Sequence, residues 1–424
     1  MKEQNNSKVP QIRFKGFVGE WEKKPLNQVS DVRDGTHESP KYQPSGHPLV
    51  TSKNVKDGWI NYDSVQFISS SDFDAINQRS KVDKGDILMG MIGTIGNTAL
   101  IREDPDFAIK NVALIKLSKA INENYLYQYF QTQQFNRQLE GSSEGGTQKF
   151  ISLTKIRSLV VTKSSLPEQT KIGGFFRELD SLIGLHQHKH DKLVTLKKTM
   201  LQKMFPQPGA ATPEIRFKGF SGDWVEKKLG DSTTNVASNT LSRANLNYRS
   251  GLARNVHYGD ILVQYKEVLD VQNNGIPFIS DDAVATKLKS SNLANGDIVV
   301  ADAAEDEMVG KCTEIQNVGD QIVLAGLHTI ALRPLTNFAP FYLGYYLNSD
   351  AFHDQLLPIM QGTKVLSISK TAIKHTAICF PIDEAEQQKI GTYFHKLDEL
   401  ISKHAIQLQK LTQIKSACLE KMFV

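Results

Sequence analysis

The chain has 424 residues, a formal net charge of +4 at pH 7 and a sequence pI near 8.6. This length exceeds one ordinary hydrophobic core and predicts two to three domains. Its three cysteines, Cys312, Cys379 and Cys418, exclude a disulfide framework and a CxxC metal site. No run is apolar enough to cross a bilayer, and the first residues lack a secretory leader, so a cytoplasmic location is expected. The mildly basic charge permits nucleic-acid binding without requiring it.

The opening of the chain is written twice. "PQIRFKGFVGEWEKKPL" at 10–26 returns as "PEIRFKGFSGDWVEKKL" at 213–229, after the proline-rich segment "FPQPGAATP", which reads as a linker. Three further motifs are also duplicated in the same order: "GGTQKFISLTKI" (145–156) with "QGTKVLSISKTAI" (361–373), "EQTKIGGFFRELDSLI" (168–183) with "EQQKIGTYFHKLDELI" (386–401), and "LQKMF" (201–205) with "LEKMF" (419–423). The repeats predict two similar frames related by a pseudo-twofold axis.

The interiors of the two halves do not match. Residues 27–144 and 230–360 share only fragments: "KGDIL" (84–88), "YGDIL" (258–262) and "NGDIV" (295–299). Each half is therefore a similar frame around a dissimilar insert, and dissimilar inserts suggest that each half recognises something different.

Both inserts are rich in short β-type runs separated by turn residues. The first contains residues 47–68, 85–101 and 111–117, and the second contains 259–265, 296–303 and 328–335. Each insert then ends in a helical stretch, at 123–139 and 339–356. The pattern predicts an α+β domain in each half, with antiparallel strands and helix at the C-terminal side.

Two long helices are expected at 168–204 and 386–422, each about 55 Å long. Both lack proline, and their apolar residues follow a seven-residue repeat that predicts an antiparallel two-helix coiled coil. The predicted contact positions on the first helix are Ile172, Phe175, Leu179, Leu182, His186, Lys189, Leu193, Leu196, Met200 and Lys203. Those on the second helix are Ile390, Tyr393, Leu397, Leu400, His404, Gln407, Leu411, Ile414, Cys418 and Lys421.

The middle of this repeat is polar. A symmetric register places His186 opposite Gln407 and Lys189 opposite His404, and such a layer would fix the register and the distance between the halves. The alternative is a solvated waist that specifies nothing. "LHQHKH" at 185–190 also permits a metal interpretation, but one helix supplies only two ligands, and a structural role is favoured.

Catalytic motifs are missing from the sequence. It contains no GxxxxGK[ST] phosphate loop, no adenine-methyltransferase motif, no convincing PD…(D/E)xK cluster, and no GxSxG or HExxH. "GMIGTIGN" at 90–97 has the wrong glycine spacing for a dinucleotide site. A binding protein is therefore favoured over an enzyme.

Together, the duplicated "EQxKIG", "LDxLI" and "KMF" motifs around two unlike inserts resemble the specificity subunit of type I restriction–modification systems. The resemblance covers nearly the whole chain. It implies two target recognition domains, each reading one half of a bipartite asymmetric site in double-stranded DNA, separated by paired spacer helices. It also implies a non-catalytic chain without its own cofactor. The expected partners are two methyltransferase subunits that use S-adenosylmethionine and a nuclease/translocase subunit that uses ATP and Mg.

The resemblance divides the chain into target recognition domain 1 (1–150), a conserved region with its spacer helix (151–205), a linker (206–212), target recognition domain 2 (213–372) and a second conserved region (373–424). It is firm for the helices and loose for base-reading residues. The DNA-binding candidates of the first insert are Thr36, His37, Lys53, Asn54, Thr94, Lys110 and Asn111. Those of the second are Gln264, Tyr265, Lys266, Lys311 and His328.

Gly-Thr-Lys motifs at the end of each insert are candidates for backbone contact. They contain Gly146, Thr147, Lys149, Gly362, Thr363 and Lys364. A glycine turn beside a lysine could hold a phosphate, or it could only turn the chain into the frame. Two rival functions stay open: a DNA-modifying enzyme with an unrecognised active site, and a scaffold whose inserts bind other proteins.

Overall fold

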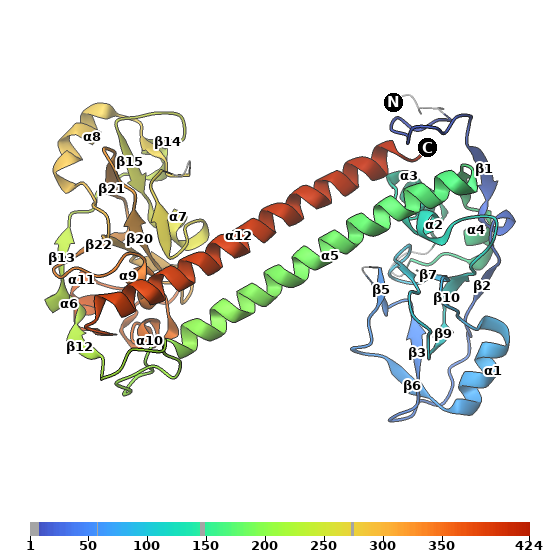
Figure 1. Ribbon diagram of the computed structural model, residues 1–424, viewed down its shortest axis with the longest axis horizontal. Helices are drawn as coiled ribbons and strands as arrows, with labels where there is room; N and C mark the ends of the chain where they lie inside the picture. The colour runs from blue at the N-terminus through green and yellow to red at the C-terminus, as the bar shows by residue number, and fades with distance from the viewer. Residues whose placement is uncertain (1–7, 57, 145–148, 273–274) are drawn as a thin grey trace. The chain divides into compact units, whose positions relative to one another are not determined.

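The computed structural model describes residues 8–56, 58–144, 149–272 and 275–424. The chain forms two compact units: residues 1–187 with 406–424, and residues 188–405. Each unit combines small sheets with helices, which confirms the predicted α+β class (Figure 1). Within the described ranges, no helix is both long and apolar enough to cross a membrane.

The two longest helices are α5 (Leu166–Lys203) and α12 (Glu384–Lys421), each of 38 residues. They agree with the predicted helices to within two residues at either end. Pro167 lies in the first turn of α5, where the missing N–H leaves no bond unmade. At the start of α12, Asp383 Oδ1 accepts a hydrogen bond from the Ala385 N–H at 2.9 Å. Each helix contributes one part to each unit.

In the first unit, the end of α12 packs against the start of α5. Lys415 Nζ lies 2.8 Å from Asp180 Oδ1, and the Phe423 and Phe176 ring centroids are 5.7 Å apart. From the first contact to the second, the residue number rises from 415 to 423 on the α12 side and falls from 180 to 176 on α5. The two segments are therefore antiparallel.

In the second unit, the end of α5 packs against the start of α12. Lys197 Nζ lies 2.8 Å from both Asp398 oxygens, and Phe205 stacks on Phe394 at 5.8 Å between centroids. Each unit therefore contains the same antiparallel contact, with the roles of the two helices exchanged.

The buried stripe on these helices differs in part from the predicted one. Five predicted contact positions are exposed: Leu182, Lys189, Leu400, Ile414 and Lys421. The more buried residue is instead the next one along the chain, at Ile183, His190, Ile401, Lys415 and Met422. Phe175 and Tyr393 are only partly buried, whereas their neighbours Phe176 and Phe394 are fully buried.

The cause of this difference is an ambiguity in the repeat. A seven-residue pattern can continue with a step of three or of four residues after each core position. Two adjacent aromatics, Phe175 with Phe176 and Tyr393 with Phe394, fit either step. Phe423 packs against Phe176, and Phe205 packs against Phe394. The core position that follows Ile172 or Ile390 is therefore four residues further along the helix. The predicted pairing of His186 with Gln407 and of Lys189 with His404 stays a prediction.

A buried ion pair joins the repeated opening motif to the first turn of each long helix. Arg13 donates to both Glu168 oxygens at 2.6 and 2.8 Å, and to the Gly19 carbonyl at 2.7 Å. Arg216 donates to Glu386 at 2.7 and 2.8 Å, and to the Gly222 carbonyl at 2.6 Å. The duplicated sequence therefore builds the same joint twice.

The opening motif also caps the far end of the other long helix. In the first unit the Ile12 N–H donates to the Lys421 carbonyl at 2.9 Å, and in the second the Ile215 N–H donates to the Lys203 carbonyl at 2.9 Å. The motif then forms an edge strand of a two-stranded antiparallel sheet, β1 (Glu22–Pro25) with β11 (Val160–Lys163) or β12 (Val225–Lys228) with β24 (Ala377–Phe380). We call these repeated segments, together with the long helices, the frame.

The first insert contains two sheets and a short hairpin. The four-stranded sheet has the order β2 (Val32–Asp34), β10 (Val112–Ile115), β7 (Ile87–Gly90), β8 (Thr98–Leu100). The three-stranded sheet has the order β6 (Gln66–Ile68), β3 (His47–Thr51), β9 (Ala108–Lys110), with β3 and β9 parallel. The other elements are β4 (Val55–Lys56), β5 (Trp59–Ile60), α1 (Ser70–Ser80), α2 (Glu123–Tyr129), α3 (Gln133–Ser142) and α4 (Leu153–Ser158).

The second insert has the same plan with additional strands. Its five-stranded sheet has the order β13 (Thr233–Val236), β22 (Thr329–Pro334), β18 (Ile298–Ala301), β20 (Cys312–Gln316), β16 (Val268–Asp270). Its four-stranded sheet has the order β14 (Leu246–Asn247), β17 (Phe278–Ile279), β15 (Ala253–Val256), β21 (Ile322–Ala325), with β15 and β21 parallel. The other elements are β19 (Ala303–Ala304), β23 (Leu366–Ser367), α6 (Leu229–Ser232), α7 (Tyr258–Val263), α8 (Asp282–Leu288), α9 (Tyr342–Leu347), α10 (Asp350–His353) and α11 (Lys370–Lys374).

The central strands are continuously apolar because both faces of their sheet are covered. On β10, Ala113 and Ile115 join the core that contains Trp21 and Tyr125, while Val112 and Leu114 join a separate core on the other face. On β18, alternate residues divide in the same way between two cores. The inserts that differ in sequence therefore share one layered plan.

One predicted strand is wrong. Residues 258–263, in the fragment "YGDIL", form helix α7, whereas the other two GDI fragments lead into β7 and β18. His257 Nδ1 accepts from the Gly259 N–H at 3.2 Å, and Asp260 in the first turn pairs with Arg243 at 2.7 Å. Ile261 is buried and Val263 is exposed, which a strand with period two would not produce.

Candidate nucleic-acid interface

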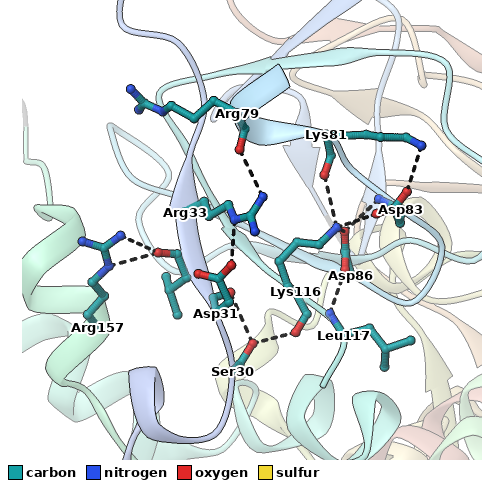
Figure 2. Close-up of polar contacts among 11 residues, drawn as sticks. Ser30, Asp31, Arg33, Arg79, Lys81, Asp83, Asp86, Lys116, Leu117 and Arg157 are labelled. Carbon is teal, nitrogen blue, oxygen red and sulfur yellow. Dashed lines mark hydrogen bonds and ion pairs between the residues drawn. The ribbon is translucent and has the colours of Figure 1, made fainter. Parts of the chain in front are cut away.

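The two inserts share a buried anchor that positions their loops. Asp86 follows Gly85 at the start of β7, is fully buried and accepts from Lys116 Nζ at 2.6 Å and from the Leu117 N–H at 2.7 Å (Figure 2). Asp83 joins the same lysine at 2.7 Å. Burial alone would lower the pKa of Lys116, but its hydrogen bonds to Asp83 and Asp86 outweigh burial and raise it.

The second insert repeats this anchor with another cation. Asp297 follows Gly296 at the start of β18, and Arg333 donates to its two oxygens at 2.8 and 2.6 Å. The Ala294 N–H donates to Asp297, as the Asp83 N–H does to Asp86. The GDI fragments that lead into β7 and β18 are thus structural turns, held by a cation that lies near the end of the neighbouring strand β10 or β22.

The candidate residues of the first insert meet at one loop cluster. Ser52 lies at its centre: its hydroxyl donates to the Asn111 carbonyl at 2.7 Å and accepts from the Met91 N–H at 3.0 Å. Thr94 Oγ1 donates to the Ser52 carbonyl at 2.6 Å, and the Gly93 N–H donates to the Lys149 carbonyl at 3.1 Å. We define the first loop cluster as residues 35–41, 51–54, 90–97, 110–111 and 149–150.

His37 lies on the exposed side of this cluster. Its Nδ1 is 2.8 Å from Asn111 Oδ1, and its Nε2 is 2.7 Å from Asp34 Oδ2. Asn111 adopts a positive φ of 51° between β9 and β10, which turns its side chain toward the histidine. The hydrogen bond to Asn111, followed by that to Asp34, raises the pKa of His37 above its usual value. Arg79 also contacts Asp34 and opposes this shift.

The remaining candidates of the first insert differ in what they expose. Lys53 and Lys149 are exposed, and Lys110 Nζ donates to Ser39 Oγ at 2.5 Å. Asn54 is buried, and its Oδ1 accepts from the Thr51 N–H at 2.9 Å while its Nδ2 donates to the Asn61 carbonyl. Asn54 therefore closes a turn and cannot reach a base from this position.

The Gly-Thr-Lys motif forms a hairpin where the structure describes it. In the second unit, Gln361 and Ser367 bond reciprocally at 3.0 and 2.8 Å, and Gly362 has a φ of 121°. A Cβ on Gly362 would lie 2.0 Å from the Val365 carbonyl oxygen, so this turn requires glycine. Thr363 and Lys364 lie exposed at the hairpin tip. In the first unit Glu144 and Phe150 bond in the same way, while Gly146 and Thr147 lie outside the described residues.

Four candidates of the second insert lie at or beside one pocket. Tyr265, Lys266 and Lys311 line an open pocket of about 690 Å³ that also contains Glu267 and His353. Gln264 Nε2 donates to the Gly275 carbonyl at 3.4 Å, as does the Tyr265 hydroxyl at 3.3 Å. Tyr265 is buried, and burial raises its pKa.

Two lysines of this group are committed to contacts inside the unit. Lys266 Nζ donates to Ser402 Oγ on α12 at 2.7 Å. Lys311 Nζ donates to the Leu262 carbonyl at 2.9 Å, and burial lowers its pKa. Lys266 therefore fastens the insert to its frame, whereas Lys311 ties two segments of the insert to each other.

His328 is the second insert's counterpart of Asn111. It has a positive φ of 52° between β21 and β22, its Nδ1 is 3.3 Å from Asp302 Oδ1, and its ring packs edge-on against Tyr258 at 5.2 Å. The Asp302 carbonyl accepts from the Ile368 N–H at 2.9 Å, which connects His328 to the hairpin. We define the second loop cluster as residues 257–259, 302–310, 326–328 and 361–367.

Several residues of the interface escaped the sequence analysis. Ser52 organises the first cluster, and Asp34 orients His37, yet neither stands out from ordinary loop serines and aspartates. Metal-ligand geometry gives no candidate among the described residues, where no three histidine, cysteine or acidic side chains are grouped.

These observations define a duplicated α+β protein in which each frame supports an insert with its own loop cluster. The chain matches the model of the type I restriction modification DNA specificity domain over residues 19–195 and 254–413. This match covers most of the chain, and the protein belongs to that family.

Relatives agree with this assignment. Over 196 residues the chain is 23% identical to the putative type I restriction enzyme MjaX specificity subunit of Methanocaldococcus jannaschii, covering 44% of this chain and 45% of that protein. Over 130 residues it is 28% identical to the type I restriction enzyme EcoBI specificity subunit of Escherichia coli, covering 30% of this chain and 27% of that protein. The chain thus spans less than half the length of either curated relative.

A solved structure shares the fold over nearly the whole chain. The type I restriction–modification S subunit of M. genitalium aligns with a TM-score of 0.60 and 14% identity, covering 98% of this chain and 99% of that one.

Proposed function

We propose that this chain is the sequence-specific DNA-recognition subunit of a type I restriction–modification complex. Each insert reads one half of a bipartite, asymmetric site in double-stranded DNA. The paired helices set the spacing of the half-sites and dock two methyltransferase subunits, and a nuclease/translocase subunit joins for restriction. The partner subunits bind and use S-adenosylmethionine, ATP and Mg, whereas this chain catalyses no reaction. The complex acts in the cytoplasm.

The repetition of identical joints around different loops carries this proposal. The pairs Arg13–Glu168 and Arg216–Glu386 brace the two frames in the same way, and Asp86–Lys116 and Asp297–Arg333 repeat an anchor inside the inserts. The loop clusters differ in the residues that they expose. A protein that recognises two different half-sites needs two similar frames that carry two different contact surfaces.

The frames support the docking of two copies of one partner. One protein bound twice requires two similar surfaces, and the frames are the part of this chain that is similar in both units. Loops that carry His37, Lys53 and Lys149 support contact with phosphates and base edges.

DNA binding by the chain in complex with its methyltransferase subunits tests the proposal. Affinity for random duplex should fall steeply with salt, because phosphate contacts release counterions. One bipartite duplex should bind about a thousandfold or more tightly than random duplex. Affinity that stays equal for all sequences in the complex would contradict the proposal.

A second assay separates recognition from catalysis. The chain alone, incubated with plasmid and either S-adenosylmethionine or ATP with Mg, should neither methylate nor cleave the plasmid. Product formation by the chain alone would support the rival DNA-modifying enzyme.

A further inference from the structure

The first unit exposes a tryptophan at the tip of the β4–β5 hairpin. Trp59 is 62% exposed, whereas Trp21 and Trp224 are buried in the cores of the two units. The chain has three tryptophans in total, so Trp59 is the one that solvent reaches. Hydrophobic burial therefore does not explain why an indole occupies this position.

The ring of Trp59 is held rigidly from behind. The Arg102 guanidinium lies 4.6 Å from the Trp59 ring centroid and 5.5 Å from that of Tyr127, which is itself buried. Arg102 donates to the Leu100 carbonyl at 3.2 Å and to the Gly58 carbonyl at 3.4 Å, so its own position is fixed. A cation sandwiched between two rings orients the indole and leaves its other face open.

The hairpin is fixed to the first loop cluster. The Asn61 N–H donates to the Asn54 carbonyl at 2.8 Å, and Asn97 Nδ2 donates to the Val55 carbonyl at 3.3 Å. Lys56 pairs with Trp59 across the hairpin, and both Lys56 and Lys53 are exposed. Both lysines belong to the hairpin or to the turn before it, whereas the exposed Glu103 and Asp104 belong to a separate turn after Arg102.

The second unit builds the corresponding edge differently. In the first unit, Gly58 of the hairpin lies beside Ala99 of the edge strand β8. The strand of the second unit that corresponds to β8 is β20, and strand β16, which follows Glu267, lies beside it. Glu267 forms an ion pair with Lys197 at 2.7 Å. A protein that binds one copy to each unit, such as the methyltransferase subunit, would need the same surface on both units. Trp59 occurs on one unit, which fits a role in reading one half-site.

We propose that Trp59 contacts DNA by inserting its exposed ring as a wedge between two base pairs at the half-site read by the first insert, while Lys53 and Lys56 contact nearby phosphates. This inference rests on the proposed function. Proteins that bend DNA insert apolar side chains between base steps, and basic side chains on the neighbouring phosphates hold them there.

Fluorine NMR tests this contact. The chain is labelled with 5-fluorotryptophan and reconstituted with unlabelled methyltransferase subunits, and Trp59→Phe assigns the Trp59 resonance. The target duplex should shift this resonance and remove its sensitivity to exchange of H2O for D2O. A shift caused by the methyltransferase subunits without DNA would overturn the proposal, as would an unchanged resonance in a complex that binds the duplex. Failure to bind any duplex selectively would instead overturn the proposed function.

Substitution gives an independent measure. Trp59→Ala should weaken binding of the target duplex about ten- to a hundredfold, because one lost base–aromatic contact is worth about 1–3 kcal/mol. Trp59→Phe should recover part of the loss. Tyr62→Ala, which removes an exposed ring that packs against Phe107, is the matched control and should change affinity less than about threefold. Equal losses for both alanine variants would overturn the assignment. Scrambling one of the two half-sites should abolish the loss caused by Trp59→Ala, and scrambling the other should not. A loss that persists in both scrambled duplexes would also overturn the assignment.

Discussion

A single buried carboxylate joins the opening motif to the long helix in each frame. Glu168 and Glu386 lie in the first turn of their helices, where the helix dipole favours negative charge, and each is almost completely buried against an arginine. The hydrogen bond to Glu168 raises the pKa of Arg13, and that to Glu386 raises the pKa of Arg216. Both arginines therefore stay charged at any pH at which the protein folds.

Removing one charge from this joint should destabilise its unit. Glu168→Gln and Glu386→Gln should each lower the free energy of unfolding by about 2 kcal/mol, because the arginine stays charged and loses the carboxylate that compensates its charge. Glu178→Gln, on the exposed face of α5, is the control and should change it by less than about 0.5 kcal/mol. Denaturant unfolding measures all three. Equal changes in the free energy of unfolding for Glu168→Gln and Glu178→Gln would show that the Arg13–Glu168 pair does not stabilise the unit.

His37 should make DNA binding depend on pH. Its pKa is raised by Asn111 and Asp34 against the opposing charge of Arg79, so the protonated form is favoured in the folded protein. The stability that this provides is complete below the unfolded pKa of about 6.5 and is lost as pH rises through the raised folded value. A cation in the first loop cluster is lost over the same interval.

The salt dependence of DNA affinity measures that cation. Between pH 6 and pH 8.5, the slope of log affinity against log salt should become shallower by about one, the contribution of one phosphate contact. His37→Gln should show the shallow slope at both pH values, and Asn111→Ala should move the transition to lower pH. A wild-type slope that stays constant with pH would exclude His37 from phosphate contact.

At the scale of elements, regular segments could be predicted and local turns could not. Long proline-free repeats gave α5 and α12 to within two residues because many positions agree. The choice between Phe175 and Phe176 depends on Phe423, more than two hundred residues away in the sequence, which no local pattern contains. Residues 258–263 resemble a strand by composition, but the Arg243–Asp260 pair favours helix there.

Two adjacent glycines in α5 should respond oppositely to alanine. A Cβ on Gly173 would lie 2.7 Å from Asn122 Oδ1 and 2.8 Å from the Tyr125 nitrogen, so Gly173→Ala should destabilise the first unit by about 1–3 kcal/mol. Gly174 has nothing within 4 Å of such a Cβ, and Gly174→Ala should stabilise it by up to about 1 kcal/mol. Thermal unfolding compares them. Stabilisation by Gly173→Ala would show that α2 does not pack closely on α5.

At the scale of the whole molecule, duplication was readable from the sequence while the contact surface was only partly so. Repeated motifs located both frames, and Thr36, His37, Lys110 and Asn111 do meet in one cluster. Asn54 and Tyr265 were chosen for their chemistry, yet both are buried, because side-chain type does not reveal which way a turn faces. The anchors at Asp86 and Asp297 show why unlike inserts keep one plan: the contacts that the two inserts share are few and buried.

Mapping methylated adenines tests the account most directly. The chain, reconstituted with its methyltransferase subunits and S-adenosylmethionine, is given unmodified genomic DNA, and every N6-methyladenine is located by single-molecule sequencing. We predict one motif of two unlike halves with an invariant spacer, and exchange of residues 27–144 for an insert of another specificity should alter one half alone. Methylation without a motif, or an exchange that alters both halves together, would contradict the account.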